Sequence, residues 1–141
     1  MRIERVTEAA EVHLGAALFD DAPRPKATAR FLAEPGHHLL FAYDDDGRPV
    51  GMVSGVETTH PDKGTEMFLY ELSVAPEARR RGVATALVGA LAEIAERAKC
   101  YGMWVAVDTD NEAALATYRR AGAHGEPPSA TLSWSFSGAR P

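Results

Sequence analysis

The sequence is poor in cysteine and has no long apolar run, and both absences restrict the kind of protein it can be. Cys100 is the single cysteine among 141 residues, which excludes an internal disulfide and leads us to expect a reducing, cytoplasmic location. No apolar run reaches the roughly 18 residues that cross a bilayer, and the opening MRIERVTEAAEV lacks the apolar centre of a signal peptide. We therefore expect one cytoplasmic domain over residues 1–141.

Basic residues are also in the minority, because 15 Lys and Arg stand against 20 Asp and Glu, for a net charge of -5. This balance argues against general nucleic-acid binding, in which a basic face supplies most of the affinity. One basic cluster, Arg79–Arg81, interrupts the acidic pattern. We expect an anionic partner at that cluster and a cationic one elsewhere.

Histidines are few and lack metal-ligand spacing, so we expect no metal site. Four of the five are interpreted as loop or surface residues: His37, His38, His60 and His124.

Periodicity and turn residues predict an α/β fold, a mixed sheet with helices packed on it. The expected strands cover residues 2–6, 37–43, 48–58, 65–74, 101–107 and 130–136, and the expected helices cover 8–19, 25–34, 82–99 and 111–122. Thr7 is expected to cap the first helix. The strand at 65–74 is nearly continuous in apolar character, so we expect it to be central.

The stretch LYELSVAPEARRRGVATALV (69–88) combines a strand, a short loop, a glycine and a helix start. The first N–H groups of a helix lack internal partners and lie at the positive end of its dipole, which favours phosphate binding. Gly82 and Ala84 leave room for an anion, and Thr85 offers a hydroxyl. The alternative is a solvated basic loop that only begins the helix.

Arg79, Gly82 and Ala84, preceded by Val74 and Pro76, closely resemble the acyl-CoA signature of the GNAT superfamily of N-acyltransferases. The resemblance implies a mostly antiparallel central sheet flanked by helices. It also implies that acetyl-CoA places its pyrophosphate on the loop amides and its pantetheine arm along the strand that ends at Val74. The acyl-CoA residues expected in this segment are Leu72, Ser73, Val74, Arg79, Arg80, Arg81, Gly82, Val83, Ala84 and Thr85.

A second segment, NEAALATYRRAG (111–122), resembles the other acyl-CoA motif of this superfamily. On a helix Asn111, Ala114 and Tyr118 share one face. The resemblance implies that Asn111 contacts pantetheine and that Tyr118 lies near the thioester sulfur, although Ala123 stands where Phe is usual. Taken alone, Tyr118 could equally be a core aromatic.

Glu71 is the acid inside the apolar central strand, where a carboxylate is costly unless it is paired or functional. Strict alternation would place it on one face with Leu69 and Ser73. We expect Glu71 to accept a proton from the amine, directly or through water, or to anchor the substrate; an ion pair with Arg79 is the alternative.

Two further groups are expected to complete the chemistry. A phenol has an ordinary pKa near 10, which suits it as an acid for a leaving thiolate whose thiol has a pKa of about 8.5. Tyr118 is expected to supply this proton. A backbone N–H near Leu72 or Val74 is expected to bond the oxyanion.

The strand Tyr70-Glu71-Leu72 with Val74 looks most like the small aminoglycoside 3-N-acetyltransferases, which carry Asp at the position of Glu71. The resemblance implies a polycationic substrate and a homodimer formed through sheet edges or C-terminal strands. The expected acidic cleft comprises Glu57, Asp62, Glu66, Glu71, Asp108 and Asp110, and the expected substrate residues are Tyr70, Glu71, Asp108 and Asp110. Alternatives are acetylation of a polyamine, small metabolite or protein amine, and an acyl-CoA-binding module without turnover.

Overall fold

A single five-stranded sheet organises the protein, in the order β1-β2-β3-β4-β5. The computed structural model describes residues 1–125, 132–133 and 135–136. The strands are β1 (Arg2–Arg5), β2 (His37–Tyr43), β3 (Pro49–His60), β4 (Gly64–Val74) and β5 (Met103–Trp104). Neighbours are antiparallel except β4 and β5, which are parallel. The predicted mixed, mostly antiparallel sheet is confirmed.

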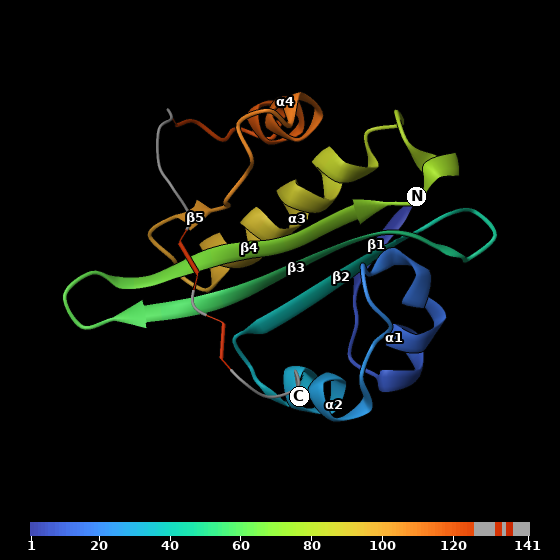
Figure 1. Cartoon of the computed structure of the whole chain (residues 1–141), viewed down its shortest axis with the longest axis horizontal. Coiled ribbons are helices and arrows are strands. Elements are labelled where there is room, and N and C mark those ends of the chain that lie inside the picture. Colours follow the sequence, from blue (N-terminus) through green and yellow to red (C-terminus); the bar gives the residue numbers. More distant parts are fainter. Residues whose placement is uncertain (126–131, 134, 137–141) are drawn as a thin grey trace.

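Helices cover the two faces of this sheet (Figure 1). One side carries α1 (Ala9–Leu14), the 3-10 turn η1 (Ala16–Leu18) and α2 (Pro25–Ala33). The other side carries α3 (Val83–Arg97), with α4 (Glu112–Arg120) packed beside it, and a second 3-10 turn, η2 (Pro76–Ala78), leads from β4 toward α3. No helix in the described part of the chain has the length and apolar character needed to cross a membrane.

Each face has its own apolar core. Residues of β2, β3, β4 and α3 form one, including Leu40, Val53, Leu69, Leu87 and Leu91. A smaller one, beneath α1 and α2, consists of Val6, Val12, Leu18, Leu39, Phe41, Tyr43 and Met52. Glycines in β3 let α3 approach closely, because a Cβ at Gly51 would lie 2.8 Å from Val83 Cγ1.

A β-bulge in β4 decides which way its side chains face. Gly55 of β3 pairs with Leu69 and Ser54 pairs with Glu71, so Tyr70 is an extra residue. The extra residue reverses the alternation. Leu69 packs in the α3 core, whereas Ser73 lies on the α1 side, where its hydroxyl donates to the Leu18 carbonyl (2.5 Å). The expectation that Leu69, Glu71 and Ser73 share one face is therefore wrong.

Other differences from the sequence-based expectation are local. The first helix ends at Leu14 instead of Phe19, and Thr7 does not cap it, since Glu11 accepts hydrogen bonds from the amides of Thr7 and Glu8 (3.2 and 3.1 Å). The strand expected at 101–107 pairs with β4 only at Met103–Trp104. Of the strand expected at 130–136, residues 130, 131 and 134 lie outside the described residues, and the described residues 132–133 and 135–136 are not assigned to a strand.

Candidate active site

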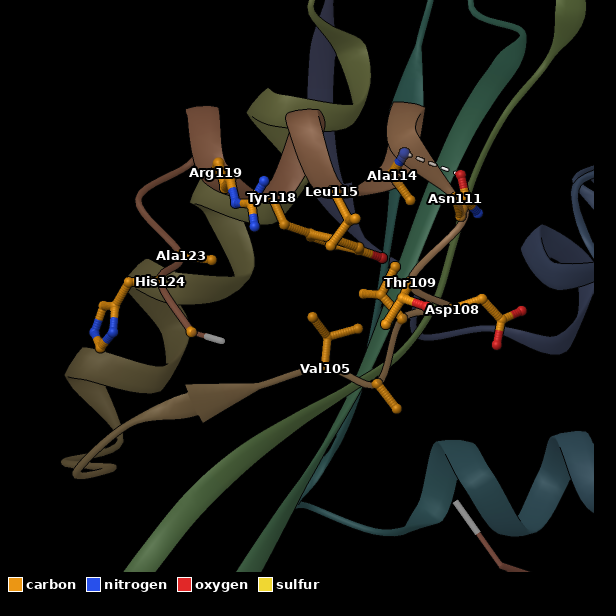
Figure 2. Close-up of a pocket in the computed structure, with 13 residues that line it drawn as sticks. Val105, Asp108, Thr109, Asn111, Ala114, Leu115, Tyr118, Arg119, Ala123 and His124 are labelled. Carbon is orange, nitrogen blue, oxygen red and sulfur yellow. Dashed lines mark hydrogen bonds between the residues drawn. The ribbon is translucent and has the colours of Figure 1, made fainter. Parts of the chain in front are cut away.

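The end of β4 faces an opening because β5 leaves it early. The two strands pair only at Met67 with Met103 and at Phe68 with Trp104. The segment that follows β5, Val105–Thr109, instead lines a pocket of about 650 Å³ together with α4 (Figure 2). The lining of this pocket comes from the segment after β5, from α4 and from residues 123–125, and the end of β4 lines a second pocket through Val74.

Two backbone amides near the end of β4 point away from β3. The Ala75 amide donates to the Val50 carbonyl of β3 (2.8 Å). Because successive amides of a strand alternate between its two edges, those of Leu72 and Val74 are directed away from β3. Neither residue is in a β5 pairing within the described structure. These amides can pair with an amide-containing chain or bond a carbonyl oxygen on which charge develops.

The loop after β4 has the backbone conformation of an anion site. Arg80 (φ 65°) and Gly82 (φ 77°) are both left-handed, and α3 begins at Val83 with no side-chain cap on its first amides. Left-handed residues next to a helix start turn successive N–H groups toward one point, which suits phosphate. A Cβ at Gly82 would meet no atom within 4 Å, so the space above it is open.

A pocket of about 550 Å³ lies at this loop. It is lined by Val74, Ala78, Arg79, Arg80, Gly82, Val83, Ala84, Thr85, Ala113, Thr117 and Arg120. Most of the expected acyl-CoA residues of the first motif are thus brought together, while Leu72, Ser73 and the exposed Arg81 are not among the lining residues. The loop therefore fits the pyrophosphate of an acyl-CoA on the evidence of its own geometry.

Two arginines have roles that the motif did not give. Arg79 Nε donates to the Val74 carbonyl (3.3 Å), so this side chain holds the loop against the strand end. Arg120 reaches the pocket from α4 and was missed by sequence reasoning. The sequence does contain a pattern that could have predicted this position, since Ala113, Thr117 and Arg120 have the spacing of one helical face.

The second motif lies together on the wall of the larger pocket (Figure 2), to which Asn111, Ala114 and Tyr118 all contribute. Asn111 Oδ1 accepts the Ala114 amide (3.1 Å), so the side chain caps α4. Tyr118 is half-buried, and burial raises the pKa of its phenol. The hydroxyl is therefore protonated at neutral pH and is a potential proton donor.

Glu71 lies on the opposite face of the sheet, in an acidic environment. Burial raises the pKa of its carboxyl, and the negative charges of Asp20 and Asp21 raise it further. These two aspartates follow η1, whose Leu18 carbonyl is held by Ser73 on β4. Sequence reasoning missed them, because only the folded contact between the η1 turn and the sheet brings them to Glu71.

Most of the other acids expected in the cleft already have partners. Glu57 pairs with His38 (2.6 Å), Asp62 pairs with Lys63 (2.7 Å), and Glu66 accepts from Tyr101 (2.6 Å). Asp62 is nine residues from Glu71, about 30 Å along an extended chain. Asp108 lines the larger pocket, whereas Asp110 is exposed and lines neither pocket.

His38 also differs from the expectation of a surface residue. It is buried in β2, with Nδ1 2.6 Å from a terminal nitrogen of Arg5 and Nε2 2.6 Å from Glu57 Oε2. Since a guanidinium only donates, Nδ1 accepts and Nε2–H donates. Within the described residues no group of histidine, cysteine and acidic side chains could hold a metal ion.

Comparison with known proteins agrees with this geometry. Residues 5–123 match the acetyltransferase (GNAT) family, and the chain belongs to that family. A search of curated protein sequences gives no match. With this family and fold, the protein is an acetyl-CoA-dependent N-acetyltransferase.

Several solved structures of aminoglycoside acetyltransferases share the fold. One is meta-AAC0020 from an uncultured soil metagenomic sample, determined with trehalose and with sisomicin (TM-score 0.87, 16% identity, 96% of both chains covered). Another is HMB0005, also from an uncultured soil metagenomic sample (TM-score 0.79, 27% identity, 95% of this chain and 98% of that chain). A third is the 6′-N-acetyltransferase AAC(6′)-Ih from Acinetobacter baumannii (TM-score 0.79, 19% identity, 96% and 99%).

Proposed function

We propose that this protein transfers the acetyl group of acetyl-CoA directly to an amine of an aminoglycoside, at the 3-N position. The observation that carries the proposal is the packing of η1 against β4, where Ser73 bonds the Leu18 carbonyl. This packing brings Asp20 and Asp21 to the side of the sheet that carries Glu71, whose pKa is raised first by burial and then by these two charges. Three acids at the amine side of the sheet suit a substrate with several ammonium groups. The Tyr70-Glu71-Leu72 strand favours the 3-N position, whereas the named position among the solved relatives above is 6′-N.

In the proposed reaction Glu71 takes a proton from the substrate ammonium, directly or through one water. Its raised pKa makes it a better base for this step than an ordinary glutamate. The freed amine attacks the acetyl carbonyl, so a C–N bond forms and the C–S bond breaks. Amides of Leu72 and Val74 bond the carbonyl oxygen as charge develops, and Tyr118 protonates the departing thiolate. The attacking nitrogen loses its second proton to water to give the amide, and water returns a proton to Tyr118.

The test is steady-state turnover over a panel of amines, followed by release of thiol. We expect gentamicin-like aminoglycosides to be better substrates than spermidine or a lysine peptide, and NMR of the product to place the acetyl group on the 3-amine. Acetylation of the peptide or polyamine alone would overturn the aminoglycoside proposal, and acetylation at the 6′-amine would overturn the position.

Variants separate the roles of the acids. Glu71→Gln should lower kcat by about 10² or more and move the pH–rate profile toward alkaline values, where the amine deprotonates unaided. Asp20→Asn should mainly raise KM, because a carboxylate at the edge holds substrate and transition state alike. Asp110→Asn should raise KM less, since Asp110 is exposed and outside both pockets.

A further inference from the structure

Three aromatic side chains form a row across β5 and β4, next to Glu71. Trp104 stacks on Phe68 with ring centroids 4.4 Å apart, and Phe68 meets Tyr70 edge-on at 5.8 Å. Phe68 is partly buried in the row, whereas Trp104 and Tyr70 are 48% and 66% exposed. We call Phe68, Tyr70 and Trp104 the aromatic shelf. Large aromatic rings that are exposed side by side, unlike single ones, mark a binding surface.

The shelf lies on the amine side of the sheet. Phe68 pairs with Val56, which pairs with His37, and the His37 ring contacts Phe31 of α2. Paired residues of neighbouring strands point to the same face. Tyr70 directly precedes Glu71, whose β3 partner Ser54 pairs with Leu39 of the α1-side core. A ligand with one amine at Glu71 can therefore extend over the shelf without crossing the sheet.

The shelf is also held in place from its far end. Glu66 accepts a hydrogen bond from the Tyr101 hydroxyl (2.6 Å). That bond lowers the pKa of the Glu66 carboxyl, and His60, whose Nε2 lies 3.4 Å from Glu66 Oε1, lowers it further. The Trp104 ring is held on its inner side by its stacking on Phe68. A ring fixed before binding loses little conformational entropy when a ligand stacks on it.

Carboxylates stand at both ends of this aromatic surface, Glu66 at one and Glu71 with Asp20 and Asp21 at the other. Aromatic faces attract ammonium groups and accept apolar C–H faces. Phe68 and Glu71 pair with Val56 and Ser54, which are two residues apart in β3, so the shelf begins about 7 Å from Glu71 along the sheet. This separation lets a ring that is linked to the ring at Glu71 reach the shelf. A multi-ring polycation matches this arrangement of charge and aromatic surface, while a purely apolar ligand would not use the negative charge at its two ends.

We propose that the aromatic shelf is a substrate subsite that holds a second six-membered ring of an amino sugar whose acetylated ring lies at Glu71. The proposal rests on the function proposed above and adds which part of the substrate is recognised. It makes Trp104 and Tyr70 specificity-determining residues, with no part in the chemical step. Their contribution should therefore appear only with substrates that reach beyond one ring.

The kinetic test compares kanamycin or gentamicin, with three rings, with the single-ring core 2-deoxystreptamine. Trp104→Ala and Tyr70→Ala should each lower kcat/KM for the three-ring substrates by about 3- to 30-fold, the range of a cation–aromatic contact, with the loss in KM. The same variants should change kcat/KM for 2-deoxystreptamine by less than about 2-fold, and Trp104→Phe should restore most of the loss. Leu14→Ala, at a 78% exposed apolar residue of α1, is the matched control and should change neither substrate.

A binding readout separates failure of the shelf from failure of the proposed function. Trp104 and Trp134 are the two tryptophans, so Trp134→Phe leaves Trp104 as the single reporter. Its fluorescence should respond saturably to the three-ring amines and weakly to 2-deoxystreptamine. If no aminoglycoside is turned over but this response persists, the proposed function fails and the shelf stands. If the Trp104→Ala and Tyr70→Ala variants lose kcat/KM equally for three-ring and single-ring substrates, or lose none, the proposal that the shelf is a substrate subsite is overturned.

A second copy of the chain is the other possible occupant. Light scattering of wild type and Trp104→Ala tests it. Loss of a dimer in the variant, with an unchanged ratio of three-ring to single-ring kcat/KM, would make the shelf an interface and overturn the proposal.

Discussion

The two halves of the site are built from different materials. The proposed acyl-CoA half consists mainly of backbone: the amides of Leu72 and Val74, the left-handed turn at Arg80 and Gly82, and the start of α3. The proposed amine half consists of side chains from distant segments, with Glu71 on β4 and Asp20 after η1. A site made of backbone depends on a few glycines and turn residues close in sequence, whereas a site made of side chains depends on how remote segments pack.

The largest effect should come from the backbone half, at Gly82. Its φ of 77° is unfavourable for any L side chain and most of all for a β-branched one. Gly82→Val should therefore shift the turn and place a side chain in the phosphate pocket, weakening acetyl-CoA binding by about 100-fold or more, while Gly82→Ala should weaken it by about 10-fold. The measurement is the thermal shift produced by acetyl-CoA and its Kd.

Gly89 provides the matched control. It lies within α3, and a Cβ there would meet no atom within 4 Å. Gly89→Ala should keep acetyl-CoA affinity and stabilise the helix by about 0.5–1 kcal/mol. If Gly82→Val binds acetyl-CoA as well as Gly89→Ala does, the loop is not the phosphate site.

The same contrast explains what the sequence could predict. The order of helices and strands as far as α4, the turn that leads into α3 and the residues that share one face of α4 could be predicted, because each depends on local periodicity or on a contiguous motif. The change in which β4 side chains face which side of the sheet could not be predicted, because the bulge at Tyr70 is set by pairing with β3. Asp20, Asp21 and the buried His38 were missed for the same reason: their surroundings exist only after β2, β4 and η1 have packed together.

Tyr118 is the side chain of the acyl-CoA half that we expect to act in catalysis, and its substitution tests this role. Tyr118→Phe keeps the ring that packs beside the α3 core and removes the proton. If Tyr118 is the general acid, kcat should fall by up to about 10² with little change in acetyl-CoA Kd. Pre-steady-state or single-turnover kinetics measures the chemical step itself.

The matched control for this change is Tyr43→Phe, in the α1-side core, which should leave kcat unchanged. If the rate of the chemical step is unchanged in Tyr118→Phe, Tyr118 is a packing residue. The acyl-CoA half would then act through its backbone groups alone.

The smallest effect concerns stability and bears on the amine half. Glu71 has a pKa raised by burial and by Asp20 and Asp21. A carboxyl whose pKa is higher in the folded state binds more protons there, so folding stability falls as pH rises from the ordinary glutamate pKa, about 4.3, through the raised value. At neutral pH the ionised carboxylate therefore destabilises the fold.

Glu71→Gln should remove that destabilisation while it lowers turnover. The variant should be more stable than wild type at pH 7 by at most about 1 kcal/mol, because solvent screens this half-buried group. The advantage should shrink as pH falls through the raised pKa and vanish below the ordinary one. Denaturant unfolding of both proteins from pH 4 to pH 8 measures it. A variant that is less stable at pH 7 would mean that Glu71 makes a stabilising contact, and the carboxylate would then have a structural reason to be in the strand. A gain in stability together with a loss of turnover would instead show that Glu71 destabilises the fold and is needed for the reaction.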